Sequence, residues 1–199
     1  MWCYYVIEII CGYLCGSVSP SVILSKFAYK KDVRDEGSGN AGATNVARVF
    51  GMKAGFITLG CDVLKIVIPM LLGMWLDGDR GVCVAGIAGI LGHCFPVFFK
   101  FRGGKGVSVA ATIAMFLGWQ VLAIGLSVFI IIVLVTRIVS ISSIFAALSL
   151  IVATLIFAGD NTYKIILVLV TAALIVFMHR ENIVRLVHGE EKKFTPKKK

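Results

Sequence analysis

Long apolar segments separated by short polar ones dominate the chain. The apolar segments extend over about residues Trp2 to Leu24, Ala54 to Leu76, Val82 to Phe99, Ile138 to Ala158, and Tyr163 to Met178. A helix needs about 20 apolar residues to cross a bilayer core of about 30 Å. Each of these five segments therefore predicts a membrane-spanning helix.

A sixth apolar stretch runs from Val107 to Thr136 and is too long for one ordinary crossing. Its 30 residues would form a helix of about 45 Å at 1.5 Å per residue. The sequence Gly118-Trp119-Gln120 offers a break in its middle. We therefore predict two short spans, Val107 to Leu117 and Val121 to Val135, and seven spans in all.

Composition agrees with this pattern. Hydrophobic residues make up 58% of the 199 residues, charged residues make up 16%, and the mean hydropathy is +0.92. A water-soluble domain would not have these values. We expect an all-α, polytopic integral membrane helical bundle that forms a single domain over residues 1–199.

The positive charges predict the orientation of this bundle. All but three of the 20 Lys and Arg residues fall on one side of a seven-span arrangement, the exceptions being Lys65, Arg80 and Lys164. Cytoplasmic loops of membrane proteins are enriched in Lys and Arg. The N-terminus is therefore predicted outside and the C-terminus, with Lys197, Lys198 and Lys199, in the cytoplasm.

Two further features exclude other classes. The six cysteines lie in or beside apolar segments without metal-ligand spacing, so we predict small core residues and no metal site. The net charge of +9 is shared between short loops and a lysine tail without interleaved aromatic residues. This favours membrane topology and phosphate binding over nucleic-acid binding.

Three polar segments on the predicted cytoplasmic face have the residue types of an anion site. The first is GSGNAGATNVAR, whose glycines allow backbone N–H groups to turn toward one anion and whose Arg48 can bind it with two hydrogen bonds. Its other candidate phosphate-binding residues are Gly37, Ser38, Gly39, Asn40, Thr44 and Asn45.

The second segment is FRGGKG, and it directly precedes the predicted helix from Val107. Its candidates are Arg102, Gly103, Gly104, Lys105 and Gly106, because a phosphate binds well at a helix start. It is not a Walker A loop, since Phe99 occupies the position of the first glycine and Gly106 follows the lysine.

The third segment, HRENIVRLVHGEE, follows the last span and supplies His179 and Asn182. A histidine at the membrane boundary can act as a general base or as a phosphate donor. Ser142, from the turn near Arg137, reaches the same predicted face.

The sequence lacks the motifs of several hydrolases and transferases. It contains neither Gly-x-Ser-x-Gly nor His-Glu-x-x-His, and no histidine is followed five positions later by aspartate.

The segments GSGNAGATNVAR, HCFPVFFKFRGGKG and HRENIVRLVHGEE, in this order among several spans, closely resemble the bacterial acyl-phosphate glycerol-3-phosphate acyltransferases. The resemblance implies a bacterial cell-membrane enzyme with its active site facing the cytoplasm. It would transfer an acyl group from acyl phosphate to glycerol 3-phosphate, giving lysophosphatidic acid. Membrane lipids would surround it, and neither a cofactor nor a protein partner is expected.

The family resemblance and the residue types together predict the catalytic groups Ser38, Arg48, Lys105 and His179. Two phosphate substrates bring about −3 to −4 charges near neutral pH, which several basic groups must balance. His93 is expected to be a core histidine, and Asp62 and Lys65 a neutralising pair three residues apart.

A transporter of a phosphorylated metabolite is the alternative. Transporters bind their substrates near the bilayer midplane, whereas the polar residues here gather at one interface.

Overall fold

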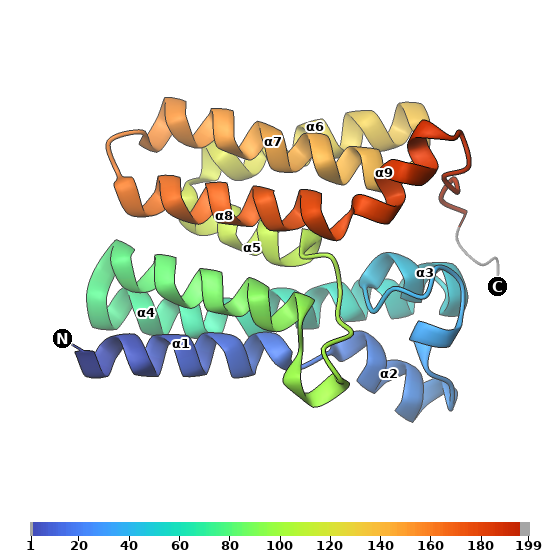
Figure 1. The fold of residues 1–199 in the computed structure, drawn as a ribbon, viewed down its shortest axis with the longest axis horizontal. Coiled ribbons are helices and arrows are strands. Elements are labelled where there is room, and N and C mark those ends of the chain that lie inside the picture. Colours follow the sequence, from blue (N-terminus) through green and yellow to red (C-terminus); the bar gives the residue numbers. More distant parts are fainter. Residues whose placement is uncertain (1, 196–199) are drawn as a thin grey trace. The chain divides into compact units, whose positions relative to one another are not determined.

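The computed structural model describes residues 2–195, and these residues form helices without strands. The elements are α1 (Trp2–Ser17), α2 (Pro20–Tyr29), η1 (Val33–Asp35), α3 (Ala43–Phe50), α4 (Met52–Cys94), η2 (Val97–Phe99), α5 (Val107–Leu117), α6 (Trp119–Thr136), α7 (Val139–Ala158), α8 (Thr162–Met178) and α9 (Arg180–Val187). Figure 1 shows their order along the chain. Met1 and the tail lysines Lys197, Lys198 and Lys199 lie outside the described residues.

Each apolar segment contains α-helix, and the division of the long stretch is confirmed. Helix α5 ends at Leu117 and α6 begins at Trp119. Gly118 between them has φ 148°, a backbone conformation that L side chains rarely adopt.

The first apolar segment departs from its prediction as one continuous helix. Helix α1 ends at Ser17, and α2 begins at Pro20 and continues to Tyr29, beyond the expected end at Leu24. Pro20 occupies the first turn of α2, where its missing N–H group is tolerated. The predicted span therefore consists of two helices with a break at residues 18–19.

Helix α4 contains two apolar segments in one element. Asp77 and Gly78 have non-helical backbone angles, and Figure 1 shows the chain reversing there into two antiparallel limbs. The second limb ends at Cys94, so Pro96 lies beyond the helix.

By length and composition, four of the described helical segments can cross a membrane, or five if the pair α8–α9, bent by 56°, forms one span. The four are Trp2–Tyr29, Met52–Phe99, Trp119–Thr136 and Val139–Ala158. Because Met52–Phe99 includes the reversal, it supplies two antiparallel limbs. The count of seven spans and the orientation of the termini stay predictions.

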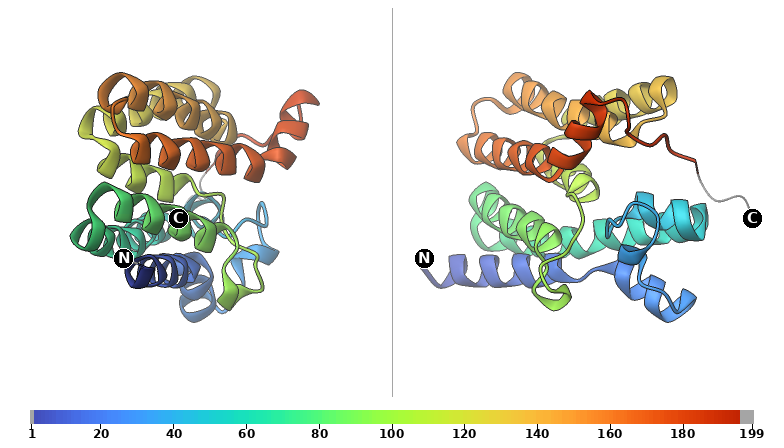
Figure 2. Two further views of the ribbon diagram at one scale, coloured as in Figure 1. Left: turned by 60° about the vertical axis from the view of Figure 1, so that its left-hand side comes forward. Right: turned by 45° about the vertical axis from the view of Figure 1, so that its right-hand side comes forward.

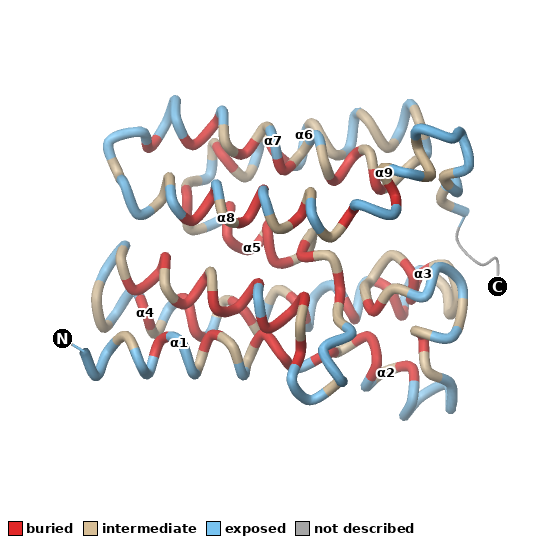
Figure 3. The backbone as a smooth tube through the Cα atoms, viewed as in Figure 1, coloured by how far each residue is buried: buried red, intermediate tan, exposed pale blue. Residues whose placement is uncertain are grey.

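The chain divides into two compact units, which are described separately. Among the described residues, unit 1 comprises residues 2–109 and Thr195, and unit 2 comprises residues 110–194. In unit 1, α1 lies along α4 in both views of Figure 2. Burial in this unit concentrates on the second limb of α4 (Figure 3).

Glycines permit this close packing in unit 1. A side chain at Gly16 would collide with the backbone of Gly89, and one at Gly92 would collide with the carbonyl of Tyr13. The two limbs of α4 meet through Gly73 and Gly81 in the same manner. Small residues bring helix backbones together in membrane proteins, where dispersion contacts replace the hydrophobic effect.

In unit 2, α7 packs against both α6 and α8. Helix α6 has few buried residues, and Ile131, Leu134 and Val135 are exposed on it. An apolar helix with this exposure is suited to contact lipid tails.

The prediction that all six cysteines are core residues is partly wrong. Cys83 and Cys94 are buried, whereas Cys3 and Cys61 are exposed. Both exposed cysteines lie on apolar helices. On such helices, apolar residues suit contact with lipid as well as contact with protein.

Candidate active site

The first loop, residues 30–42, joins α2 to α3 and contains the short helix η1. The side chain of Asn45, in the first turn of α3, holds this loop. Its Nδ2 donates to the carbonyls of Val33, Glu36 and Asn40 at 2.9, 3.0 and 3.1 Å. Its Oδ1 accepts from the backbone N–H of Ser38 at 2.9 Å. Because both polar ends of this buried amide bond to the loop, Asn45 shapes the loop from within.

The backbone and its packing both require glycine at position 37 of this loop. Gly37 has φ 63°, and a Cβ there would collide with the side chain of Asn45. The backbone groups of Ser38 and Asn40 both bond to the Asn45 side chain, and Thr44 directly precedes Asn45 in α3. Ser38 is exposed, whereas Asn40 and Thr44 are half-buried. Arg48 is half-buried in the last turn of α3.

The second loop, residues 95–106, leads from the end of α4 to the start of α5. Within it, the tetrapeptide Gly103–Gly106, which we call the glycine turn, packs against α4. The backbone N–H of Gly104 donates to the carbonyl of His93 at 3.1 Å. A side chain at Gly103 would meet the same carbonyl, and one at Gly104 would meet the His93 ring. Both positions therefore exclude larger residues.

The second loop also has an unusual backbone before the glycine turn. Lys100 and Phe101 both have positive φ, 58° and 55°, although neither is glycine. Such residues are uncommon and persist only where the surrounding structure holds them. The N–H groups of Phe99 and Phe101 both donate to the carbonyl of Pro96, which closes the turn.

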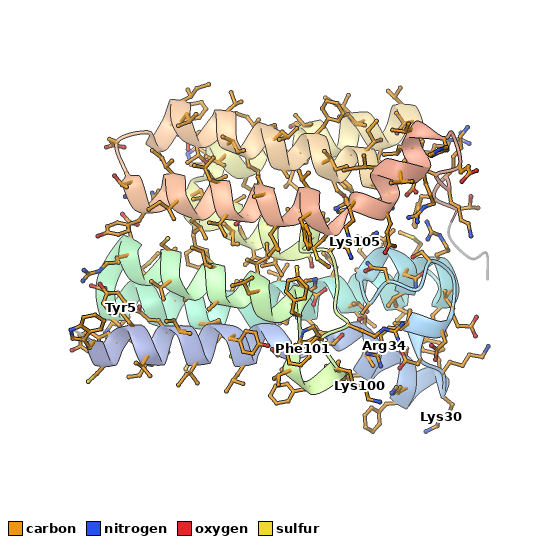
Figure 4. The ribbon with its side chains drawn as sticks, in the orientation of Figure 1. Tyr5, Lys30, Arg34, Lys100, Phe101 and Lys105 are labelled. Carbon is orange, nitrogen blue, oxygen red and sulfur yellow. The ribbon has the colours of Figure 1, made fainter. Side chains whose placement is uncertain are left out.

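Two contacts connect the first loop to the second. The Arg34 guanidinium donates to the carbonyl of Phe99 at 2.9 Å, and Figure 4 shows Arg34 beside the turn that carries Lys100 and Phe101. In addition, the carbonyl of Ala41 lies 3.1 Å from the position of a Cβ on Gly104. Segments 65 residues apart in sequence thus form one structure.

Asp32 holds Arg34 in this position. Its carboxylate accepts from Nε of Arg34 at 3.0 Å and from NH2 at 2.7 Å, and its Oδ1 also accepts the backbone N–H of Arg34 at 3.0 Å. These hydrogen bonds outweigh the opposing effect of burial and hold the pKa of Asp32 well below its ordinary value. The sequence analysis missed both residues, although Asp-x-Arg immediately before a glycine-rich loop was a visible signal.

The basic residues of the second loop differ in exposure. Arg102 is exposed, and Lys105, inside the glycine turn, is half-buried. Gly106 has φ 81° and precedes the first residue of α5. Only Gly106 separates Lys105 from the N-terminal end of α5. Anion binding at this helix start stays a prediction.

Beneath the glycine turn lies a buried polar network. Lys65 and Asp62 form the expected pair at 2.8 Å, and Lys65 Nζ also lies 3.0 Å from Nδ1 of His93. Ser108, at the start of α5, donates to Asp62 at 3.2 Å. His93 is thus a core histidine with a polar partner.

In unit 2, His179 lies between α8 and α9 and is buried. Its Nδ1 lies 2.8 Å from the carbonyl of Ile175. A carbonyl can only accept, so Nδ1 carries the proton and Nε2 is the acceptor nitrogen of the neutral ring. A general base requires an unprotonated nitrogen, which in this tautomer is Nε2.

Glu191 organises the residues after α9. Its carboxylate accepts from Ser140 at 2.9 Å, from Asn182 at 2.6 Å and from Arg185 at 2.7 Å. Burial opposes ionisation of Glu191, but these hydrogen bonds outweigh it and lower its pKa. The sequence analysis did not identify Glu191 as a residue that places Asn182.

Ser142 is buried in the first turn of α7. Its hydroxyl donates to the carbonyl of Ile138 at 2.8 Å. Its predicted contact with phosphate, and the predicted meeting of His179 and Asn182 with the two loops of unit 1, stay predictions. In the described part of the chain, no group of three His, Cys, Asp or Glu residues could hold a metal ion.

The long apolar helices define a multi-pass membrane protein. The family model described as "Glycerol-3-phosphate acyltransferase" matches residues 6–189. The chain therefore belongs to the glycerol-3-phosphate acyltransferase family.

Individual relatives agree with this assignment. A glycerol-3-phosphate acyltransferase from Thermoanaerobacter pseudethanolicus is 43% identical over 98% of both chains. Glycerol-3-phosphate acyltransferase 2 from Bacillus anthracis is 42% identical over 94% of this chain and 98% of the relative.

Solved structures share the fold. A crystal structure of PlsY, an integral membrane glycerol 3-phosphate acyltransferase in its glycerol 3-phosphate form, matches with a TM-score of 0.90 and 37% identity over 96% of each chain. The lysophosphatidic acid form of PlsY matches with a TM-score of 0.87, covering 96% of this chain and 95% of PlsY.

Proposed function

We propose that this protein transfers a fatty acyl group from acyl phosphate to the primary hydroxyl of glycerol 3-phosphate, giving lysophosphatidic acid and inorganic phosphate. The reaction would take place at the cytoplasmic face of a bacterial cell membrane. Family membership and the glycerol 3-phosphate and lysophosphatidic acid forms of PlsY support the acceptor and the product.

The observation that carries the proposal is the joining of the two glycine-rich loops. Hydrogen bonds of Arg34 and the packing of Gly104 beside Ala41 hold them together. The second loop carries Arg102 and Lys105, and helix α3 after the first loop carries Arg48; their positive charges can balance phosphate. Glycine-rich backbone beside a helix start adds N–H donors.

In the proposed reaction, the hydroxyl oxygen of glycerol 3-phosphate attacks the acyl carbonyl carbon. The bond from this carbon to the phosphate oxygen breaks, and phosphate leaves with the electron pair. The hydroxyl proton passes either to Nε2 of His179 or to the departing phosphate. Ser38, Arg48, Lys105 and Asn182 bind and orient the phosphates, so catalysis rests on positioning and charge balance.

Purified protein incubated with palmitoyl phosphate and glycerol 3-phosphate tests this proposal. We expect lysophosphatidic acid and inorganic phosphate in equal amounts. Product formed only with acyl-CoA would refute acyl phosphate as the donor. No product with either donor would refute the activity.

Lys105→Ala tests phosphate binding by the second loop. Loss of a hydrogen bond to a charged group costs about 1.5–3 kcal/mol, so the KM of a phosphate substrate should rise by about ten- to a hundredfold. Lys164→Ala removes a lysine from the first turn of α8 and should leave the kinetics unchanged. Equal kinetics in both variants would contradict the role of Lys105.

The variant His179→Ala distinguishes His179 from the departing phosphate as the acceptor of the hydroxyl proton. A large fall in kcat with little change in KM supports His179 as the base. A rise in KM with most of kcat retained shows that the departing phosphate accepts the proton and that His179 binds substrate.

A further inference from the structure

The ammonium group of Lys65 has a complete set of acceptors inside unit 1. Its Nζ lies 2.7 Å from the carbonyl of Val18, 2.8 Å from Oδ1 of Asp62 and 3.0 Å from Nδ1 of His93. An ammonium group has three N–H donors and no acceptor. Three donors therefore meet three acceptors, and the Lys65 side chain is only 8% exposed.

This arrangement determines the tautomer of His93. Because Lys65 can only donate, Nδ1 of His93 must accept and carries no proton. The carboxylate of Asp62 does not compete for Nδ1, since Oδ1 lies 3.6 Å away, beyond hydrogen-bond distance. In the neutral ring the proton is then on Nε2.

Nε2 of His93 faces the glycine turn. It is the atom nearest to the position that a Cβ would occupy on Gly104, and the Ala41 carbonyl of the first loop lies 3.1 Å from the same position. The His93 carbonyl also accepts the backbone N–H of Gly104 at 3.1 Å. His93 thus contacts Gly104 through both its ring and its backbone.

The same network reaches the other end of the glycine turn. Ser108, two residues after Gly106, donates to Oδ2 of Asp62 at 3.2 Å, while Oδ1 of Asp62 accepts from Lys65. The turn that carries Lys105 is therefore held on one side through His93 and on the other through Ser108. His93 contacts Lys65 and Ser108 contacts Asp62, so the ion pair of Asp62 and Lys65 connects the two supports.

We infer that His93 is a positioning residue for the proposed phosphate-binding turn Gly103–Gly106, acting as the Nε2–H tautomer that Lys65 selects. The role in turnover rests on the proposed function, whereas the tautomer does not. In this role the His93 ring fills the space that glycine leaves at position 104. The tautomer places its N–H at Nε2, the ring atom nearest to Gly104, beside which the carbonyl of Ala41 from the first loop also lies.

The tautomer can be measured directly on the whole protein in detergent. Nitrogen-15 NMR distinguishes protonated from unprotonated imidazole nitrogens, and the spectrum of His93→Gln assigns the signals of His93 by difference. We expect a neutral ring protonated at Nε2 and unprotonated at Nδ1. A ring protonated at Nδ1, or at both nitrogens, overturns the inference.

Two substitutions then test the role of this tautomer in turnover. The amide nitrogen of Gln can reach the position of Nε2, whereas Asn ends near the position of Nδ1. His93→Gln should keep the KM values for both phosphate substrates within about threefold of wild type, a difference below about 1 kcal/mol. His93→Asn should raise the KM of at least one by about tenfold or more, with kcat at saturation less affected.

The exposed His188, whose Nδ1 contacts the carbonyl of Val184 one turn earlier, provides a matched control. His188→Asn should have wild-type kinetics. Equal KM values in His93→Gln and His93→Asn, or a loss confined to kcat, overturn the positioning role. If wild type itself makes no product, the proposed function fails, while the NMR spectrum still decides the tautomer.

Discussion

Asp32 and Arg34 show how single residues connect the loops of unit 1. Neither was predicted as a site residue, because a short acidic and basic pair is common on protein surfaces and contributes little there. In the structure both side chains are only 13% exposed, and Arg34 also bonds to the Phe99 carbonyl. The Asp-x-Arg pattern is visible in the sequence, but their partner Phe99 is distant in sequence, so the fold is needed to show that the pair connects two loops.

Asp32→Asn should make stability less dependent on acid pH. The pKa of Asp32 is lowered in the folded state, mainly by its hydrogen bonds to Arg34, so its contribution is fully present above the unfolded value of about 4. It declines as the pH falls through the lowered folded pKa. At pH 6 the variant should be about 2 kcal/mol less stable.

Thermal unfolding in detergent from pH 6 to pH 3 checks this prediction. The difference in Tm between wild type and Asp32→Asn should shrink toward the acid end. Asp35→Asn, at the end of η1, is the control. A difference that stays constant or widens at low pH would contradict the pairing with Arg34.

Helix α1 and the second limb of α4 illustrate what the hydrophobic pattern predicts for an element. The pattern correctly predicted that both segments are helices, since an apolar run in a membrane protein can satisfy its backbone only in this form. It could not identify which face of α1 meets α4, because lipid and protein interiors are similarly apolar. That face is defined by Gly12, Gly16 and the residues opposite them.

Gly16→Leu should destabilise unit 1, because a side chain there would collide with the backbone of Gly89. Overpacking of this kind costs about 1–3 kcal/mol or more, so we expect a clearly lower Tm. Gly60 on the first limb of α4 is exposed and has open space around it, which makes Gly60→Leu the control. Similar Tm values for the two variants would show that α1 does not pack closely on α4.

For the whole molecule, the membrane is the main determinant of structure. Helices with many exposed apolar residues, such as α6, are consistent with a lipid environment. The seven-span topology stays a prediction, which rests on the apolar pattern and on the distribution of Lys and Arg. It predicts opposite sides for the α7–α8 connection and the second loop.

Cysteine labelling in a cysteine-free background tests this topology in intact cells. A single cysteine introduced as Asp160→Cys, between α7 and α8, should react with a membrane-impermeant maleimide. One introduced as Lys100→Cys should react only after the membrane is opened. The reverse result would invert the orientation, and labelling of both in intact cells would rule out the seven-span arrangement.

The sequence by itself determined that the chain is helical and embedded in a membrane, and it located the three polar segments of the family. These properties depend on local composition and periodicity, and the division at Gly118 shows that even a short break can be read from a few residues. The break before Pro20, the short helix α3 and the early end of α4 were missed. Polar segments can form either loops or short helices, and long-range contacts decide between them.

Only the tertiary structure decided how these segments support one another. Asn45 was predicted to bind phosphate, but its amide bonds to four groups of its own loop. His93 was predicted to be a core residue, and it also contacts Gly104 through its ring and its carbonyl. Hydrogen bonds and close packing depend on distances between residues far apart in sequence, and those distances are set only when the helices pack.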